Sequence, residues 1–182
     1  MSERQAGIEP SHIARYILAK SFIENGSDVL DAFCGTGYGS RMLSTGNRVV
    51  CFDKFNHENT ESNVEFIQAT YPDITFGKQF DTIVCFEAIE HLPRELSKNL
   101  LQDFRKWLRP YGQLFISSPN QLNYPFDAKK IEHHYFHYKP EEMENDLNSA
   151  GFKVDRWWNQ KQKFSFKLDD GYDGRYMICR CV

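Results

Sequence analysis

The fold of this chain is decided at residues 29–39, which read Val29-Leu30-Asp31-Ala32-Phe33-Cys34-Gly35-Thr36-Gly37-Tyr38-Gly39. The first residues, which are apolar apart from Asp31, are typical of a short buried strand, and a glycine-rich turn then leads into the start of a helix. Glycines at such a turn let the backbone pass close to a ligand, and the helix N-terminus presents amide donors. The segment therefore predicts a ligand-binding unit of strand, turn and helix.

Two acidic residues indicate the kind of ligand. Asp31 lies four residues before Gly35, where a carboxylate would repel a pyrophosphate but attract a sulfonium ligand that bears an ammonium group. Asp53 ends the next apolar run, where a carboxylate can accept both hydroxyls of a ribose. Taken singly, each is equally a capping or strand-end aspartate. Together, at this spacing, they indicate a nucleoside ligand that carries positive charge.

Strand-like and helical segments alternate outward from this turn. The expected strands cover residues 28–33, 48–53, 64–67, 80–86, 113–118, 152–158 and 176–181. Helices are expected to begin at Pro10, near Arg41, near Arg94 and at Pro140. Alternation of this kind predicts crossover units. The expected fold is a single α/β domain with a doubly wound, mostly parallel seven-stranded sheet and an antiparallel edge pair whose strands share a tight connection.

Composition narrows the class of protein. Apolar residues make up 41% of the 182 residues and charged residues 26%, as in an ordinary globular domain. A net charge of −3 gives no global field for nucleic acid or an anionic membrane, and no apolar run is long enough to span a bilayer. The first residues lack the pattern of a secretory signal, and five cysteines make an odd number. These features predict a cytoplasmic protein with reduced, buried thiols.

Four ordered segments resemble the motifs of class I S-adenosylmethionine-dependent methyltransferases, of the kind called type 11/23. They are residues 31–40, 80–92, 108–120 and 134–152. The resemblance implies a Rossmann-like methyltransferase fold with S-adenosyl-L-methionine as cofactor. It indicates these cofactor-binding residues: Asp31, Phe33, Gly35, Thr36, Gly37, Asp53, Lys54, Thr70 and Phe86. Asp31 and the glycines would hold the methionine portion and Asp53 the ribose, whereas Thr70 stands where the family usually has an acid that contacts adenine.

The candidate catalytic residues are Glu87, His91 and His134. Methyl transfer needs alignment of the acceptor, and an oxygen acceptor also needs a base near neutral pKa, for which histidine is suited. A packed or solvated histidine is an equally good interpretation of His91 and of His134. With Glu90, these residues would alternatively form a metal cluster like that of small-RNA 2′-O-methyltransferases. Because Glu90-His91 also occurs in metal-free relatives, no metal is expected.

The chain divides into four functional sections. Residues 1–25 form an N-terminal helical segment, 26–118 the cofactor-binding core, 119–139 an acceptor-side loop, and 140–182 a C-terminal helix with edge strands. Loops this long are usually lids or binding loops. Tyr124, His134 and His137 are therefore expected to face the acceptor.

The function expected from these features is O-methylation of a small molecule or of a glycan sugar. Two alternatives stay open: an RNA ribose 2′-O-methyltransferase with a Glu/His metal site, and a non-catalytic S-adenosylmethionine-binding protein. Aromatic and basic residues alternate within residues 156–167, which would suit stacking on bases. We prefer a packed strand pair with inward apolar residues and solvated lysines, so nucleic acid is not the expected partner. The oligomeric state is not predicted.

Overall fold

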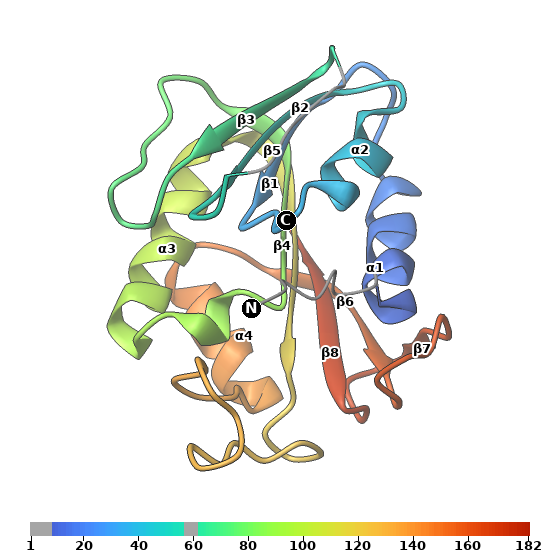
Figure 1. Cartoon of the computed structure of the whole chain (residues 1–182), viewed down its shortest axis with the longest axis vertical. Coiled ribbons are helices and arrows are strands. Elements are labelled where there is room, and N and C mark those ends of the chain that lie inside the picture. The colour runs from blue at the N-terminus through green and yellow to red at the C-terminus, as the bar shows by residue number, and fades with distance from the viewer. Residues whose placement is uncertain (1–8, 57–61) are drawn as a thin grey trace, which may run out of the picture.

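A computed structural model describes residues 9–56 and 62–182, which form one α/β domain (Figure 1). The strands are β1 (Asp28–Ala32), β2 (Arg48–Asp53), β3 (Val64–Gln68), β4 (Phe80–Phe86), β5 (Leu108–Pro119), β6 (Val154–Gln160), β7 (Asp169–Asp170) and β8 (Tyr176–Cys181). The helices are α1 (Pro10–Lys20), α2 (Tyr38–Ser44), α3 (Arg94–Trp107) and α4 (Pro140–Ser149), with a 3-10 turn, η1 (Ile89–His91). The strand order is β3-β2-β1-β4-β5-β8-β6-β7.

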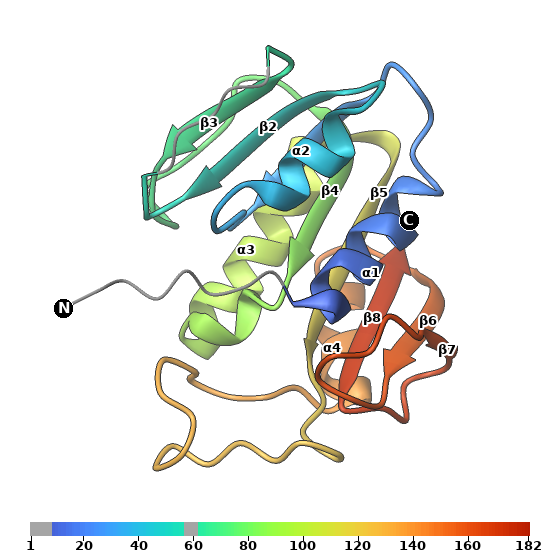
Figure 2. The same cartoon turned by 45° about the vertical axis from the view of Figure 1, so that its right-hand side comes forward.

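The parallel part of the sheet is buried on both faces. β3, β2, β1, β4 and β5 pair in parallel, and successive residues of β1 enter different cores: Val29 packs with α1 and α2, Leu30 with α3 and α4. Figure 2 shows α1 and α2 on one face of the sheet, with α3 and α4 on the other. A strand covered on both faces is expected to be mainly apolar. In β1 the apolar side chains are Val29, Leu30 and Ala32, and the buried Asp31 is the exception. The parallel strands with helices packed on both faces confirm the expected doubly wound fold.

The antiparallel edge has one strand more than expected. β8 pairs antiparallel with β5 and β6, and the two-residue β7 adds an eighth strand beside Trp158 and Asn159. Asp169 and Asp170 form no apolar pattern, so β7 was not predicted. The expected tight connection between the last two strands is wrong as well, because residues 161–175 link β6 to β8.

The aromatic residues of this edge are divided between core and surface. Trp158 lies in the core, whereas Phe164 and Phe166, beyond the end of β6, are exposed. The prediction of inward packing is therefore wrong for these two phenylalanines. Lys161, Lys163 and Lys167 each form an ion pair with an acidic residue.

All parallel strands end at one edge of the sheet. β1, β2 and β4 lie side by side, so Ala32, Asp53 and Phe86 bring their following loops together. In open α/β sheets, ligands bind in the crevice at this edge. The candidate site must therefore be built from the turn after β1, the loop after β2, and η1 after β4.

Candidate active site

The glycine turn leaves β1 through a series of left-handed residues. Phe33, Gly35 and Gly37 have φ angles of 59°, 56° and 72°. Gly37 is the N-cap of α2, and its N–H donates to the carbonyl of Cys34 at 3.0 Å. Left-handed backbone costs glycine little, which explains two of these three positions. Phe33 adopts the same conformation without that freedom, and its ring packs on Phe52 at the end of β2.

Asp53 holds the glycine turn from the neighbouring strand. Its Oδ2 accepts the N–H of Gly35 at 2.9 Å, and its Oδ1 accepts the N–H of Phe55 at 3.1 Å. A carboxylate has about four acceptor positions, so both oxygens keep lone pairs for further donors. The strand-end aspartate that the sequence assigned to a ribose therefore also fixes the loop against which a nucleoside would lie.

Asp31 lies behind the wall of the site and not on its surface. The residue is 0% exposed, and its two oxygens accept the Tyr16 hydroxyl at 3.1 Å and the Ser40 hydroxyl at 2.6 Å. Burial raises the pKa of this carboxyl to about 7, against the opposing effect of the two hydroxyl bonds. A negative charge on Asp31 would therefore act on a ligand without touching it, either by polarising the Tyr16 hydroxyl or by electrostatic attraction over a short distance.

A cavity of about 610 Å³ opens at this edge of the sheet. Its volume lies within the range usual for small-molecule and cofactor sites. The predicted cofactor residues that line it are Phe33, Gly35, Asp53, Lys54, Thr70 and Phe86, and the candidate catalytic residues that line it are Glu87 and His91. Asp31, Thr36, Gly37 and His134 are not among its lining residues. Most of the site residues predicted from the sequence therefore line one cavity.

Three tyrosines that line this cavity, Tyr16, Tyr38 and Tyr71, were missed as site residues. Tyr16 from α1 and Tyr38 from α2 both line it, and Tyr16 also packs edge-on against Phe86 at 5.1 Å. Tyr16 lies on the buried face of α1, and its ring both packs in the core and lines the cavity. The signal was available at Gly39. A side chain at that position would overlap the Tyr16 ring, so the third glycine makes room for it.

Glu87 is held by partners on two other elements. Its Oε1 accepts the Ser117 hydroxyl at 2.8 Å and lies 3.2 Å from a guanidinium nitrogen of Arg15, which is fully buried. Burial raises the pKa of Glu87, and the Arg15 charge opposes this. The backbone of Glu87 is left-handed, with φ of 49°. Glu87 therefore faces the cavity as one half of a buried ion pair.

The histidines form two hydrogen-bonded sets. Nδ1 of His91 lies 2.9 Å from the carbonyl oxygen of His133. In the other set, Nδ1 of His134 lies 2.8 Å from Nε2 of His137, whose Nδ1 lies 2.6 Å from the carbonyl oxygen of Tyr124. Burial lowers the pKa of all three bonded imidazoles, and that of His134 falls to about 4.

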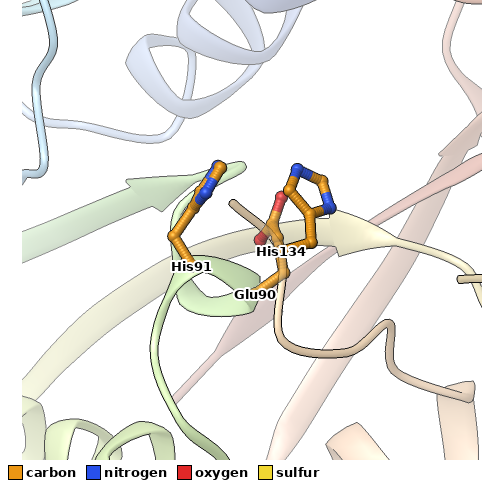
Figure 3. A group of neighbouring side chains, drawn as sticks. All are labelled: Glu90, His91 and His134. Carbon is orange, nitrogen blue, oxygen red and sulfur yellow. The ribbon is translucent and has the colours of Figure 1, made fainter. Parts of the chain in front are cut away.

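Glu90 brings the histidine sets together. Its carboxylate and the rings of His91 and His134 turn toward one another, and their ligand atoms lie within 4.8 Å of one another (Figure 3). Glu87 is not a member of this group, because its carboxylate is bound to Ser117 and Arg15. The four-residue cluster considered from the sequence is thus reduced to three.

The acceptor-side loop reaches the cavity only near its end. His133 lines the hollow, and the N–H of Tyr135 donates to the carbonyl of Glu90 at 2.9 Å. Tyr124 packs on His137 and lies under the guanidinium of Arg175, away from the cavity lining. In Figures 1 and 2 the rest of the loop extends beyond the end of β5. Residues 133–137 are the part that can meet an acceptor.

Comparison with known proteins places the chain in a family. The family model described as a methyltransferase domain matches residues 4–156. This chain belongs to the S-adenosylmethionine-dependent methyltransferase family. The family resemblance seen in the sequence is thereby confirmed.

Individual relatives of this methyltransferase-family chain are distant. A probable S-adenosylmethionine-dependent methyltransferase of Mycolicibacterium smegmatis is 31% identical over an alignment of 144 residues, and the match covers 71% of this chain and 53% of the relative. A ubiquinone biosynthesis O-methyltransferase of Actinobacillus pleuropneumoniae is 30% identical over an alignment of 122 residues, and the match covers 58% of this chain and 51% of the relative. The chain thus spans about half the length of these curated relatives.

The fold is shared with solved methyltransferase structures. The N-methyltransferase NodS of Bradyrhizobium japonicum, in complex with S-adenosylhomocysteine, superposes with a TM-score of 0.72. That alignment covers 98% of this chain and 90% of NodS at 15% identity, so the likeness concerns the fold.

Among the helices that the structure describes, none has the length and apolar character needed to cross a membrane.

Proposed function

We propose that this chain is a methyltransferase domain that binds S-adenosyl-L-methionine in the 610 Å³ cavity and transfers its methyl group. The observation that carries the proposal is Asp53, which holds the glycine turn and also lines the cavity with free acceptor capacity. We assign the whole chain to one domain with the four functional sections described above. The bound S-adenosylhomocysteine of NodS and the name of the Mycolicibacterium relative support this cofactor.

The cofactor residues divide by depth. Phe33, Gly35, Phe86 and Lys54 would contact the methionine and ribose portions directly, and Thr70 the adenine. Asp31, Thr36 and Gly37 do not line the cavity and would act indirectly. Asp31 would attract the cofactor by its buried negative charge, and Thr36 and Gly37 would set the backbone conformation of the turn. A cationic sulfonium and ammonium would favour the ionised form of Asp31.

We propose a hydroxyl oxygen of a small molecule or a glycan sugar as the acceptor. An oxygen lone pair would attack the methyl carbon, the carbon–sulfur bond would break with its electron pair on sulfur, and the acceptor proton would leave. His91 and His134 are the candidates to take that proton, with Glu87 aligning the acceptor. The Actinobacillus relative, named as an O-methyltransferase, supports oxygen. Five buried cysteines support a cytoplasmic location.

Calorimetry with S-adenosylmethionine, S-adenosylhomocysteine and NAD tests the cofactor. Binding of the first two, and about 100-fold weaker binding by Asp53→Ala, is expected because charge-assisted hydrogen bonds contribute about 1.5–3 kcal/mol each. Binding of NAD alone would overturn the proposal. A radiolabelled methyl transfer assay over extract fractions then separates an enzyme from a cofactor-binding protein, and its products distinguish oxygen acceptors from nucleic acid.

A further inference from the structure

The three donors Glu90, His91 and His134 come from segments that two hydrogen bonds tie together. The N–H of Tyr135 donates to the carbonyl of Glu90, and the imidazole of His91 donates to the carbonyl of His133. These bonds hold His134 over η1 from both sides. The approach of the three side chains in Figure 3 is therefore fixed by backbone contacts of both segments.

The carboxylate of Glu90 is buried without a partner. The residue is 1% exposed, and neither oxygen has a hydrogen-bond partner among the described residues. A buried carboxylate left alone is strongly unfavourable, and protonation would still leave a hydroxyl without an acceptor. The nearby Arg15 is already paired with Glu87. Arg15, Glu87 and Glu90 are therefore one positive and two negative side chains buried near one another. A cation bound to Glu90 would balance the remaining negative charge.

Both imidazoles present a lone pair. A carbonyl oxygen only accepts, so Nδ1 of His91 carries its proton and Nε2 is the unprotonated atom. The same argument applies to His134 and His137. Nδ1 of His137 donates to the Tyr124 carbonyl, so its Nε2 accepts from Nδ1 of His134 and leaves Nε2 of His134 unprotonated. Outer partners that fix the tautomer in this way are typical of metal-binding histidines.

We propose that Glu90, with Nε2 of His91 and Nε2 of His134, binds one divalent first-row transition-metal ion. Two imidazoles and one carboxylate are a ligand set of zinc and iron sites and suit such ions better than magnesium or calcium. His91 lines the cavity, so an ion bound by its Nε2 would lie at the border of the proposed cofactor and acceptor site. This proposal departs from the sequence expectation of no metal.

The chemical consequence rests on the proposed methyl transfer. An acceptor hydroxyl bound to the ion would lose its proton to water more readily, because a divalent cation lowers the pKa of a bound hydroxyl. The resulting oxygen would attack the methyl carbon while sulfur keeps the electron pair of the broken bond. In this arrangement His91 and His134 assist the acceptor through the metal and do not themselves take its proton.

The test is binding of Co²⁺, Zn²⁺ and Mn²⁺ to protein first treated with a chelator. One equivalent of Co²⁺ should give visible absorption bands with nitrogen and oxygen ligands, and Zn²⁺ should displace it. Glu90→Gln, His91→Ala and His134→Ala should each weaken binding by at least about 100-fold, and His137→Ala by about 10- to 100-fold, as outer-partner losses do. His133→Asn is the matched control, because its exposed side chain lies outside the group and asparagine tolerates its φ of 70°.

Equal Co²⁺ binding by wild type and the ligand variants would overturn the proposal, as would no binding by folded wild type. Thermal unfolding checks that each variant folds, and bound ion should raise the melting temperature of wild type but not of Glu90→Gln. S-Adenosylhomocysteine binding is measured on the same samples. Retained nucleoside binding without metal binding would refute the metal site alone, and the reverse result would refute the proposed cofactor alone.

Discussion

The two sides of the cavity are built by different means. On the cofactor side, the turn after β1 is held by Asp53 at the end of the adjacent strand, 18 residues away, through a backbone N–H. On the acceptor side, His91 meets the His133 carbonyl from a loop 42 residues away, and the histidine sets depend on side chains. The first side is fixed by neighbouring parallel strands and the second by a loop laid over them. Changes on the two sides should therefore have separable effects on binding and on turnover.

The largest expected separation concerns His134. His134→Ala should lower methyl transfer by about 10²- to 10⁴-fold, the range for loss of acceptor activation, whether by a base or through a metal. Affinity for S-adenosylhomocysteine, measured by calorimetry, should stay within a few-fold of wild type, because His134 does not line the cavity. Asp53→Ala should show the reverse order of effects. If His134→Ala loses cofactor affinity and turnover to the same extent, the two sides of the cavity do not act separately on binding and on turnover.

The cofactor side is also the part that sequence alone describes best. A mainly apolar strand, three glycines and a strand-end acid are local signals, and they correctly predicted the strand, the turn after it and the position of Asp53 at the end of β2. The sequence could not show that Asp31 lies behind Tyr16, because that contact joins α1 to β1 through side-chain packing. Nor could it show that Glu90 lacks a partner while Glu87 has two. Such facts depend on the distances between segments.

Asp31 tests the cofactor side through pH. Its pKa of about 7 in the folded protein lies above the value near 4 of an exposed aspartate, so the folded state keeps a proton that the unfolded chain has lost. The stability that Asp31 contributes is therefore full below about pH 4 and is lost as pH rises toward 7, by about 1.4 kcal/mol per pH unit. Asp31→Asn should gain in stability relative to wild type by up to about 4 kcal/mol across this window.

Denaturant unfolding of Asp31→Asn and wild type, followed from pH 4 to pH 8, measures that difference. Glu87 and Glu90 also have raised pKa values from burial, but the comparison with the variant cancels their shared contribution. Saturating S-adenosylhomocysteine should reduce the difference, since its ammonium favours an ionised Asp31. A difference that does not change with pH would mean that Asp31 titrates as an ordinary aspartate.

A smaller effect is expected where α1 and α2 form the wall of the cofactor side. A methyl group at Gly39 would overlap the Tyr16 ring, so Gly39→Ala must displace that ring from Asp31 and Phe86. Overpacking of this kind costs about 1–3 kcal/mol in stability, and cofactor affinity should fall with it. Gly77→Ala is the matched control, because nothing lies within 4 Å of its added carbon. If both variants unfold at the same temperature, Tyr16 is not tightly held.

The smallest expected effect is a gain, at the adenine end of the cofactor side. Thr70 lines the cavity at the position where the family usually has an acid, so Thr70→Asp should supply an acceptor for the adenine amino group. One hydrogen bond contributes about 0.5–1.5 kcal/mol, which predicts a roughly 2- to 10-fold gain in S-adenosylhomocysteine affinity by calorimetry. Thr70→Val keeps the shape without the hydroxyl and should change affinity less. Turnover at saturating cofactor should be unchanged in both variants, because residue 70 follows β3, which β2 and β1 separate from β4 and the histidines after it. A loss of affinity in Thr70→Asp would mean that the adenine lies elsewhere, and the boundary of the cofactor side would then have to exclude the end of β3.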